Sequence, residues 1–314
     1  MGRLFSASAI IPTRNRNVAL QATLESLSKQ SKQPAEIIVV DASDSMETQK
    51  LCESGIQGLL STVKYIRAAT KGAASQRNEG VALARLDCIF FMDDDLLFEE
   101  KCVERLYAAL ESNPNLGGVN AMITNQKYHP PGRVSRLLFN YLNGKRLDSY
   151  AGKCLGPIMN LLPEDRQDLP EIVPVEWLNT TCTLYKRIAL PDPPFPIFFT
   201  GYSMFEDVAI SMTVGKSWRL ANVRLAKVYH DSQPGDHKKS PFILSKMELV
   251  NRYYVMSQIL NRRGFNNILK LVVTEVYKVG SYFQSFQSIR KLPSVVTGKL
   301  VGIFEIIKAS KYVG

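Results

Sequence analysis

A short apolar run that ends in three consecutive aspartates constrains the fold more than any other stretch of this chain. The run is IFFM at residues 89–92, and the aspartates follow at residues 93–95. An apolar run of this length predicts a buried strand, and in open α/β sheets ligands bind beyond the carboxyl ends of the strands. Adjacent carboxylates repel one another unless a cation compensates them, and hard oxygen ligands at this density suit Mg²⁺ or Mn²⁺.

Side chains alternate in direction along an extended strand, and this alternation separates the three aspartates. Asp93 and Asp95 point to the same side, so we expect them to face a metal ion and a phosphate group. Asp94 points to the opposite side, and its assignment to a nucleotide site is less direct. The alternative is a solvated acidic turn that caps a helix beginning near Glu99.

Apolar runs and helical patterns alternate as far as residue 231. Strands are predicted at residues 6–15, 35–45, 62–68, 86–95, 115–124, 175–187 and 218–231. Helices are predicted at residues 23–30, 46–55, 72–85, 101–113 and 204–217. This alternation predicts an α/β fold with a Rossmann-like, mostly parallel sheet flanked by helices. Residues 125–175 break the rhythm and are expected to form a functional loop region, with a plain surface excursion as the alternative.

The charge distribution sets the C-terminal part of the chain apart. Residues 1–237 carry 26 Lys and Arg against 26 Asp and Glu, whereas residues 238–314 carry 13 against 3, a net charge of +10. Beyond Pro241 the apolar residues recur at helical spacing, which predicts amphipathic helices. We therefore divide the chain into an α/β domain at residues 1–237 and a basic helical region at residues 238–314.

The cellular location is inferred from three features of the sequence. No apolar stretch reaches the roughly 18 residues that a membrane-spanning helix needs. The N-terminal residues enter a predicted strand before an apolar leader segment can form. The 5 cysteines show no CxxC spacing and are interpreted as reduced thiols. Together these features predict a cytoplasmic protein.

Several segments, taken together, give the chain a family resemblance. They are IIPTRNR, EIIVVDASDS, KGAASQRNEGVALARLDCIFFMDDD, VEWLNTTCTLYKR, FEDVAIS, and VYHD followed later by NRYY. In their order and spacing, from about Ser8 to about Tyr254, they resemble family 2 glycosyltransferases of the GT-A fold, including those that build bacterial cell-surface polysaccharides. The resemblance implies that residues 1–237 are a GT-A catalytic domain, with residues 125–175 on the acceptor side. It also implies a nucleotide-sugar donor, most simply a UDP-sugar.

The resemblance implies roles for individual residues as well. Those assigned to the nucleotide-sugar are Pro12, Thr13, Arg14, Asp41, Lys71, Arg77, Asn78, Asp94 and Trp177. Asp93, Asp95 and His230 are assigned to the metal ion. Asp207, with Glu206 beside it, is assigned to catalysis as the general base.

The chemistry of glycosyl transfer asks for these residue types independently. A nucleoside diphosphate leaves more readily when its charge is neutralised, and a divalent metal ion does this as a Lewis acid. The attacking hydroxyl group needs a carboxylate within hydrogen-bond reach to take its proton. A single base on the face opposite the leaving group gives one in-line displacement, and therefore inversion.

Structural interpretations compete with these roles. Glu206 and Asp207 begin a predicted helix, where the macrodipole favours acidic side chains in any protein. Asp41 fits a turn residue, and His230 fits a satisfied polar residue at a strand end. Trp177 fits a core residue as well as a sugar-stacking one.

Two other functions remain as alternatives. A sugar nucleotidyltransferase has a related sheet, but it normally carries a glycine-rich loop after the first strand, where this chain has PTRNRN. A nucleic-acid-binding protein would use the basic tail, with Tyr253 and Tyr254 stacking on bases. No recognised module accompanies them, so we expect no nucleic-acid partner. Within the glycosyltransferase interpretation, Asn179–Thr181 stand where relatives often carry glycine-containing sequence, which leaves the sugar open.

The basic tail has two interpretations. Its apolar stripes are interrupted by Lys299, Gly302 and Glu305, with Lys308 and Lys311 alongside. Such stripes suit helices lying in a membrane interface, with their cations attracted to anionic lipid. We therefore expect a peripheral protein on the inner face of the cell membrane, beside a glycan or lipid-linked acceptor. The alternative is that the stripes pack on the catalytic domain or form a homodimer interface.

Overall fold

The computed structural model describes residues 2–232 and 240–310, which form two compact units. The first unit comprises residues 1–130, 151–153 and 161–233. The second unit comprises the remaining residues, 131–150, 154–160 and 234–314. The C-terminal helices therefore group with two segments that come from the interruption at residues 125–175. Lys311 lies outside the described residues.

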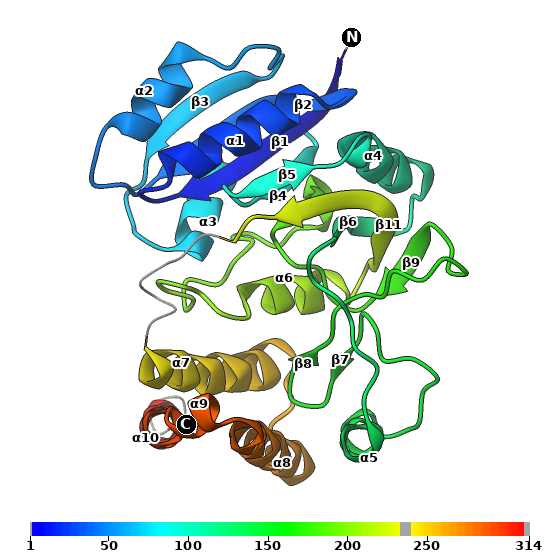
Figure 1. Cartoon of the computed structure of the whole chain (residues 1–314), viewed down its shortest axis with the longest axis vertical. Coiled ribbons are helices and arrows are strands. Elements are labelled where there is room, and N and C mark those ends of the chain that lie inside the picture. Colours follow the sequence, from blue (N-terminus) through cyan, green and yellow to red (C-terminus); the bar gives the residue numbers. More distant parts are fainter. Residues whose placement is uncertain (1, 233–239, 311–314) are drawn as a thin grey trace. The chain divides into compact units, whose positions relative to one another are not determined.

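A nine-stranded sheet forms the centre of the first unit as far as the described residues show (Figure 1). The strand order is β3-β2-β1-β4-β10-β6-β11-β5, with β9 paired to β11. The strands are β1 (Arg3–Thr13), β2 (Lys32–Asp41), β3 (Thr62–Arg67), β4 (Cys88–Met92), β5 (Leu96–Phe98), β6 (Leu116–Ile123), β9 (Ile172–Val175), β10 (Cys182–Lys186) and β11 (Arg219–His230).

The sheet is mostly parallel, as the alternating pattern predicts. β3, β2, β1 and β4 pair in parallel, and β6 pairs in parallel with β11. β10 runs antiparallel between β4 and β6, while β5 and β9 run antiparallel to β11. The carboxyl ends of β1, β2, β4 and β11 therefore lie at one edge of the sheet. The strand predicted at residues 175–187 was too long, because Trp177 lies outside the five paired residues of β10.

Helices cover the sheet on both faces. They are α1 (Asn17–Ser28), α2 (Glu47–Ser54), α3 (Ala73–Leu83), α4 (Cys102–Ser112) and α6 (Glu206–Val214). Leu20, Leu24 and Leu27 form the buried face of α1 and join the main apolar core. On α3, a Cβ atom at Gly80 would lie 2.4 Å from Cγ2 of Ile10, so glycine is what lets this helix approach β1 so closely.

Among its described residues, the second unit has helices and one short hairpin. Its elements are α5 (Arg133–Asn143), β7 (Cys154–Leu155), β8 (Met159–Asn160), α7 (Pro241–Tyr254), α8 (Phe265–Gly280), α9 (Phe286–Ile289) and α10 (Leu292–Ser310). Ser240 begins α7 by accepting a hydrogen bond from the Ile243 amide at 3.3 Å, with Pro241 in the first turn. The helices predicted beyond Pro241 are thus confirmed over the described residues. Within those residues, no helix has the length and apolar character needed to cross a membrane.

Candidate active site

The chain after β4 is held by backbone hydrogen bonds to residues next to two other strands of the first unit, β10 and β11. The amide of Asp93 donates to the Thr181 carbonyl at 2.9 Å, just before β10. The amide of Asp231 donates to the Asp95 carbonyl at 2.9 Å, just after β11. These backbone bonds fix the three aspartates at the edge where the parallel strands end.

Asp93, Asp95 and His230 come together as a group that fits a divalent metal ion. Each offers one ligand atom, and these atoms all lie within 4.8 Å of one another. Nε2 of His230 is 2.9 Å from Oδ1 of Asp95, and Nε2 of Gln126 lies 3.4 Å from the other ring nitrogen. Two carboxylates and one imidazole are a donor set that Mn²⁺ accepts. The metal role assigned to these three residues stays a prediction, and their geometry agrees with it.

Asp94 does not follow the alternation expected for an extended strand, because β4 ends at Met92 and one guanidinium nitrogen of Arg16 contacts both Asp94 and Asp95. Its carboxylate accepts from the Thr13 hydroxyl at 2.6 Å and from Nη1 of Arg16 at 3.1 Å. The same Nη1 lies 3.3 Å from Oδ2 of Asp95. Burial raises the pKa of Asp94 to about 6, although Arg16 and Thr13 act in the opposite direction. Asp94 therefore links the ends of β1 and β4.

Arg77 bridges the aspartates to the start of α6. Its side chain is almost fully buried, with Nη2 2.7 Å from Oδ1 of Asp93 and Nη1 2.9 Å from Oε1 of Glu206. The sequence assigned Arg77 to the nucleotide, whereas here it pairs with two protein carboxylates. This contact brings Asp207, the next residue of α6, to the same side of the unit as Asp93.

Burial dominates the electrostatics of the two acidic residues that open α6. Burial raises the pKa of Glu206 to about 8, against the opposing effect of the Arg77 guanidinium. Burial also raises the pKa of Asp207 to about 6, while the hydrogen bond from the Val208 amide at 2.8 Å opposes the rise. The first turn of α6 thus carries two carboxyl groups with raised proton affinity. Both the capping role and the catalytic role remain compatible with this position.

Asp41, at the end of β2, is fully buried and already has donors. Oδ1 accepts from the Ser43 amide at 2.8 Å and from the Ser43 hydroxyl. Oδ2 accepts from the Tyr65 hydroxyl at 3.1 Å and lies 3.7 Å from Nη1 of Arg67. These contacts match the turn interpretation of Asp41. Its contact with a nucleotide base stays a prediction.

A second, exposed cluster forms around Asp44 near the ends of β1 and β2. Lys71 lies 3.1 Å and Arg14 4.0 Å from its carboxylate, and the Asn15 side-chain amide exchanges two hydrogen bonds with this residue. Arg14 and Lys71, both predicted to bind nucleotide, are therefore brought together by a residue that the sequence did not single out. Their exposed positions leave them accessible to an anionic ligand.

Three other predicted residues are placed by backbone contacts. The Asn78 side chain accepts from the Phe195 amide at 3.0 Å and donates to the Phe195 carbonyl at 2.7 Å, which ties α3 to a loop. Trp177 is buried, and its Nε1 donates to the Leu161 carbonyl at 2.8 Å, which matches the core interpretation. Pro12 lies within β1, where it pairs with β2.

Sequence reasoning missed Arg16 and Gln76. Nε2 of Gln76 donates to the Thr13 carbonyl at 3.0 Å and to the Val40 carbonyl at 2.7 Å, so it joins the ends of β1 and β2. Both residues stand inside segments that carried the family resemblance. Their positions could have identified them, because Arg16 precedes the helix after β1 and Gln76 lies in the helix after β3.

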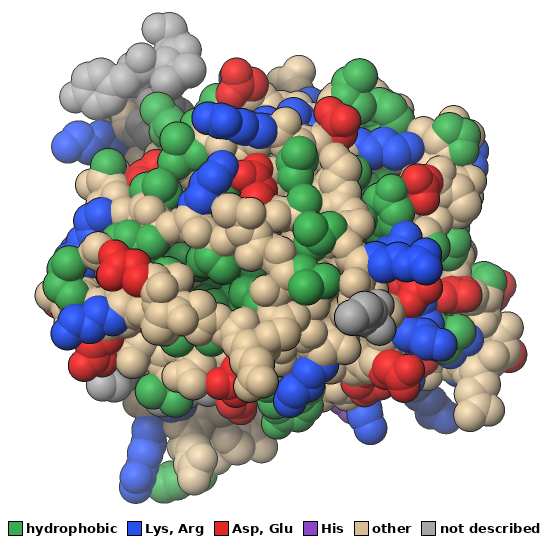
Figure 2. Space-filling model, turned by 90° about the horizontal axis from the view of Figure 1, so that it is seen from above, with side chains coloured by type: hydrophobic (Ala, Val, Ile, Leu, Met, Phe, Trp, Pro, Cys, Tyr) green, Lys and Arg blue, Asp and Glu red, His purple; other side chains and the backbone are tan. Residues whose placement is uncertain are grey.

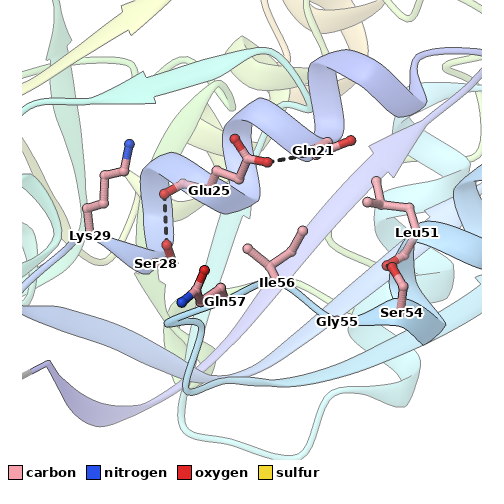
Figure 3. Close-up of a pocket in the computed structure, with 9 residues that line it drawn as sticks. All are labelled: Gln21, Glu25, Ser28, Lys29, Leu51, Ser54, Gly55, Ile56 and Gln57. Carbon is pink, nitrogen blue, oxygen red and sulfur yellow. Dashed lines mark hydrogen bonds between the residues drawn. The ribbon is translucent and has the colours of Figure 1, made fainter.

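A hollow of about 410 Å³ lies elsewhere in the first unit, between the end of α1 and the segment after α2 (Figure 3). Figure 3 shows polar side chains such as Gln21, Glu25 and Lys29 around Ile56. None of the predicted site residues lines it. On the face of the molecule seen in Figure 2, apolar and charged side chains of both signs are likewise interspersed, with no single-sign field.

Sequence comparison relates the chain to a known family. Residues 8–162, about half of the chain, match the family described as Glycosyl transferase family 2. An uncharacterized glycosyltransferase of Haemophilus influenzae is 36% identical over 125 residues, which are 39% of this chain and 38% of that protein. The matches to these curated relatives span between 31% and 54% of those proteins' length, so a large part of each relative lies outside the match.

Solved structures share the fold over more of the chain. The mannosyltransferase PcManGT from Pyrobaculum calidifontis, in complex with GDP-Man and Mn²⁺, has a TM-score of 0.55 at 12% identity, covering 96% of this chain and 87% of that one. S. aureus TarS 1-349, in complex with UDP-GlcNAc, has a TM-score of 0.53 at 16% identity, covering 94% and 79%. Identities this low establish the fold alone. Taken with the sequence match, they show that the chain belongs to glycosyl transferase family 2 and has the GT-A fold.

Proposed function

We propose that the chain is an inverting, metal-dependent glycosyltransferase. It moves a sugar from a nucleotide-sugar, most simply a UDP-sugar, to a hydroxyl group of a glycan or lipid-linked acceptor. The observation that carries the proposal is the Arg77 bridge, because it couples the start of α6 to the strand end that carries Asp93. The bound UDP-GlcNAc and GDP-Man of the two structural neighbours support a nucleotide-sugar donor.

The metal ion is proposed to lie on Asp93, Asp95 and His230, where two carboxylates and an imidazole meet. When bound, it would neutralise the diphosphate leaving group. Lys71 and Arg14 are exposed cations close to the same strand ends, and they are proposed to pair with the nucleotide phosphates or ribose. Arg77 holds Asp93 in place, which keeps one ligand oriented.

Asp207 is proposed to take the proton of the acceptor hydroxyl. As the acceptor oxygen bonds to the anomeric carbon, the bond from that carbon to the diphosphate oxygen breaks and the proton passes to the Asp207 carboxylate. Burial raises the pKa of Asp207 to about 6, which makes it a stronger base than a free aspartate and still ionised at neutral pH. Glu206 is held by Arg77, so we assign it to positioning Arg77 and Asp93 rather than to proton transfer.

The sugar pocket is proposed to include Asn179. Its Oδ1 is buried and has no hydrogen-bond partner among the described residues. A buried acceptor of this kind favours a ligand hydroxyl or amide donor, because an unsatisfied buried acceptor is costly. Asn179 also belongs to the segment where the sequence departs from relatives, which makes it a natural position for choosing the sugar.

The enzyme is further proposed to work as a peripheral protein at an anionic membrane surface, where lipid-linked acceptors lie. The basic, helical character of the second unit supports this location. A role in building cell-surface polysaccharide is the corresponding proposal for the pathway class.

The proposal is tested with Asp207→Asn. With a panel of sugar nucleotides, acceptors and Mn²⁺, we expect transfer to fall by about 10²–10⁴-fold while nucleotide binding, measured by calorimetry, is retained. The matched control is Asp168→Asn, an exposed aspartate that pairs only locally with Arg166 and should leave transfer unchanged. Full activity of Asp207→Asn would refute the assignment of the base.

Product analysis separates the remaining alternatives. An inverting glycosyltransferase releases a nucleoside diphosphate and forms a product of opposite anomeric configuration, which NMR reports directly. Pyrophosphate chemistry would instead indicate a sugar nucleotidyltransferase. A product that retains the donor configuration would rule out the single displacement.

A further inference from the structure

Charged and apolar side chains have an unusual distribution in the second unit. Its helices hold a cluster of buried and partly buried charged side chains between them, beside buried apolar ones such as Leu249 and Leu271, and expose many other apolar side chains. The cluster consists of Glu248 and Arg252 on α7, Glu275 and Lys278 on α8, and Lys299 on α10; Arg252 and Lys299 are buried, and the other three are partly buried. A water-exposed helical bundle would normally show the reverse arrangement.

The positive and negative side chains of this cluster pair with one another, so each charge has a partner within the cluster. The Arg252 side chain is 1% exposed and lies 3.0 Å from Glu248 and 3.1 Å from Glu275. Lys299 pairs with both glutamates, and Lys278 pairs with Glu248. The cluster therefore fixes which side of α7, α8 and α10 faces inward.

The outward sides of these helices carry continuous apolar stripes. On α8 the exposed residues are spaced by four, three and four, which is one helical face: Phe265, Leu269, Val272 and Val276. On α10 they are Val296, Leu300, Ile303, Phe304 and Ile307. The segment between the two helices adds Phe283, Phe286 and Ile289.

A neighbouring helix of the same unit carries a similar stripe. On α5, Val134, Leu137 and Tyr141 are exposed at a spacing of three and four. Contacts join α5 to α8, including a 2.8 Å hydrogen bond between Ser135 and Tyr277. Figure 1 shows α5, α8 and α10 as members of the same helical unit. Exposed apolar surface of this extent marks an interaction site rather than ordinary protein surface.

Cations accompany these stripes. Exposed Arg and Lys residues precede α8, connect α9 to α10 and follow the stripe of α10: Arg262, Arg263, Arg290, Lys291 and Lys308. The exposed acid on α10, Glu305, is paired with Lys246 at 2.7 Å. A second copy of this chain on the same face would bring like charges together, which is unfavourable. An anionic lipid surface offers both the apolar interior and the opposite charge.

We propose that the exposed stripes of α8 and α10, with the connecting segment 281–291, form a face that inserts into the headgroup region of an anionic bilayer. The inference deepens the membrane location given above, and it does not depend on transfer activity. Aromatic side chains enter the boundary of the acyl chains, and the cations contact lipid phosphates. The buried ion cluster keeps the three helices together while their apolar sides leave water.

The test is flotation of the full chain with vesicles of phosphatidylglycerol and phosphatidylcholine, compared with phosphatidylcholine alone. We expect binding to the anionic vesicles, weaker binding at high salt, and little binding to neutral ones. A triple variant should bind at least about tenfold more weakly, because each substitution removes one apolar side chain from the bilayer. Its substitutions are Phe265→Ser, Phe286→Ser and Phe304→Ser. Replacing Arg290 and Lys291 by Gln should cost about fivefold per residue on anionic vesicles.

A matched control replaces three equally exposed apolar residues of the first unit, Val18, Ile188 and Ile197, by Ser. This variant should float like the unchanged chain. If the unchanged chain stays in solution with anionic vesicles at low salt, or if the Phe variant floats as well as it does, the inference is wrong. If the chain is a dimer that the Phe variant dissociates and neither binds vesicles, the face is an interface between copies instead. Binding of UDP with Mn²⁺, measured without vesicles, tests the proposed function separately.

Discussion

Each unit buries an arginine between two carboxylates, but the two clusters differ in their balance of charge. Arg77 lies between Asp93 and Glu206, and Arg252 lies between Glu248 and Glu275. Near this cluster lie further carboxylates, namely Asp94, Asp95 and Asp207, together with the guanidinium of Arg16. Around Arg252 stand Lys278 and Lys299 and no further carboxylate among the described residues.

The pKa values follow this difference. In the first cluster burial raises the pKa of Glu206 and of Asp207. In the second, burial also disfavours the charged form of Glu248, but Lys278, Arg252 and Lys299 outweigh it and lower its pKa to about 2. An excess of negative charge is what a cation-binding site requires before its ligand arrives. A cluster with its own cations needs no ligand and serves the fold.

The largest expected effect comes from removing the arginines. Arg77→Met leaves two buried carboxylates without their common partner and should destabilise the protein by about 3–5 kcal/mol. Arg252→Met should cost less, because Lys278 and Lys299 keep both glutamates paired. Chemical unfolding with and without Mn²⁺ measures both effects.

Mn²⁺ distinguishes the two variants. It should raise the unfolding midpoint of Arg77→Met by less than that of the unchanged protein, because the variant has lost the contact that orients Asp93. Mn²⁺ should not alter the difference in unfolding midpoint between Arg252→Met and the unchanged protein. An equal response of the two variants would mean that the first cluster is structural like the second.

Lowering the pH should destabilise the cluster around Arg252. Nearby cations lower the folded-state pKa of Glu248 from its ordinary value of 4.5 to about 2. Its contribution to stability is therefore complete above about pH 4.5 and is lost as the pH falls towards 2, with a total of about 3 kcal/mol. Urea unfolding of the unchanged protein and of Glu248→Gln between pH 5 and pH 3 measures the difference. A difference independent of pH would contradict this account.

The first cluster should respond to pH in the opposite sense. Because the pKa of Glu206 is raised from 4.5 to about 8, its protonated form is favoured in the folded state. Its contribution is present at low pH and is lost as the pH rises through that interval. Glu206→Gln should therefore flatten the pH dependence of unfolding between pH 5 and pH 8, where Glu248→Gln should not.

A smaller effect is expected at Arg16, the cation that contacts Asp94 and Asp95. Arg16→Gln removes a positive charge that competes with the metal ion. Mn²⁺ binding without nucleotide, measured by electron paramagnetic resonance, should tighten by about fivefold, equivalent to about 1 kcal/mol. Weaker Mn²⁺ binding would show that Arg16 only holds the carboxylates in position.

The smallest structural effect is expected for Lys71→Ala. Lys71 and its partner Asp44 are both exposed, so water screens their interaction and the unfolding free energy should not change measurably. Nucleotide affinity should fall and become less dependent on salt, as calorimetry at two ionic strengths will report. An unchanged affinity would remove Lys71 from the nucleotide site.

Local sequence was sufficient for the elements that carry the site. The run at residues 89–92 followed by the aspartates predicted a strand end, and β4 ends at Met92. The expected separation of Asp94 from Asp95 did not follow, because Arg16 contacts both carboxylates. The alternation of apolar runs with helical patterns gave a mostly parallel sheet. Helical spacing beyond Pro241 gave the C-terminal helices, because a period of 3.6 residues is visible without any partner.

Pairings between distant residues were beyond the reach of local patterns. Arg77 and Glu206 are 129 residues apart in the chain, and neither segment reveals that the other lies beside it. Local patterns also did not predict that β10 lies antiparallel between β4 and β6. Nor did they predict that α5 groups with the C-terminal helices.

By itself, the sequence of this protein determined its elements, their apolar faces and the residue types that cluster at the strand ends. The tertiary structure alone decided which charges meet. It paired Arg77 with two carboxylates and Asp41 with Ser43 and Tyr65. It also placed ion pairs beside apolar residues on the inward side of the C-terminal helices. The physical reason is that periodicity specifies that a helix has two faces, while only packing against other elements specifies which face is buried.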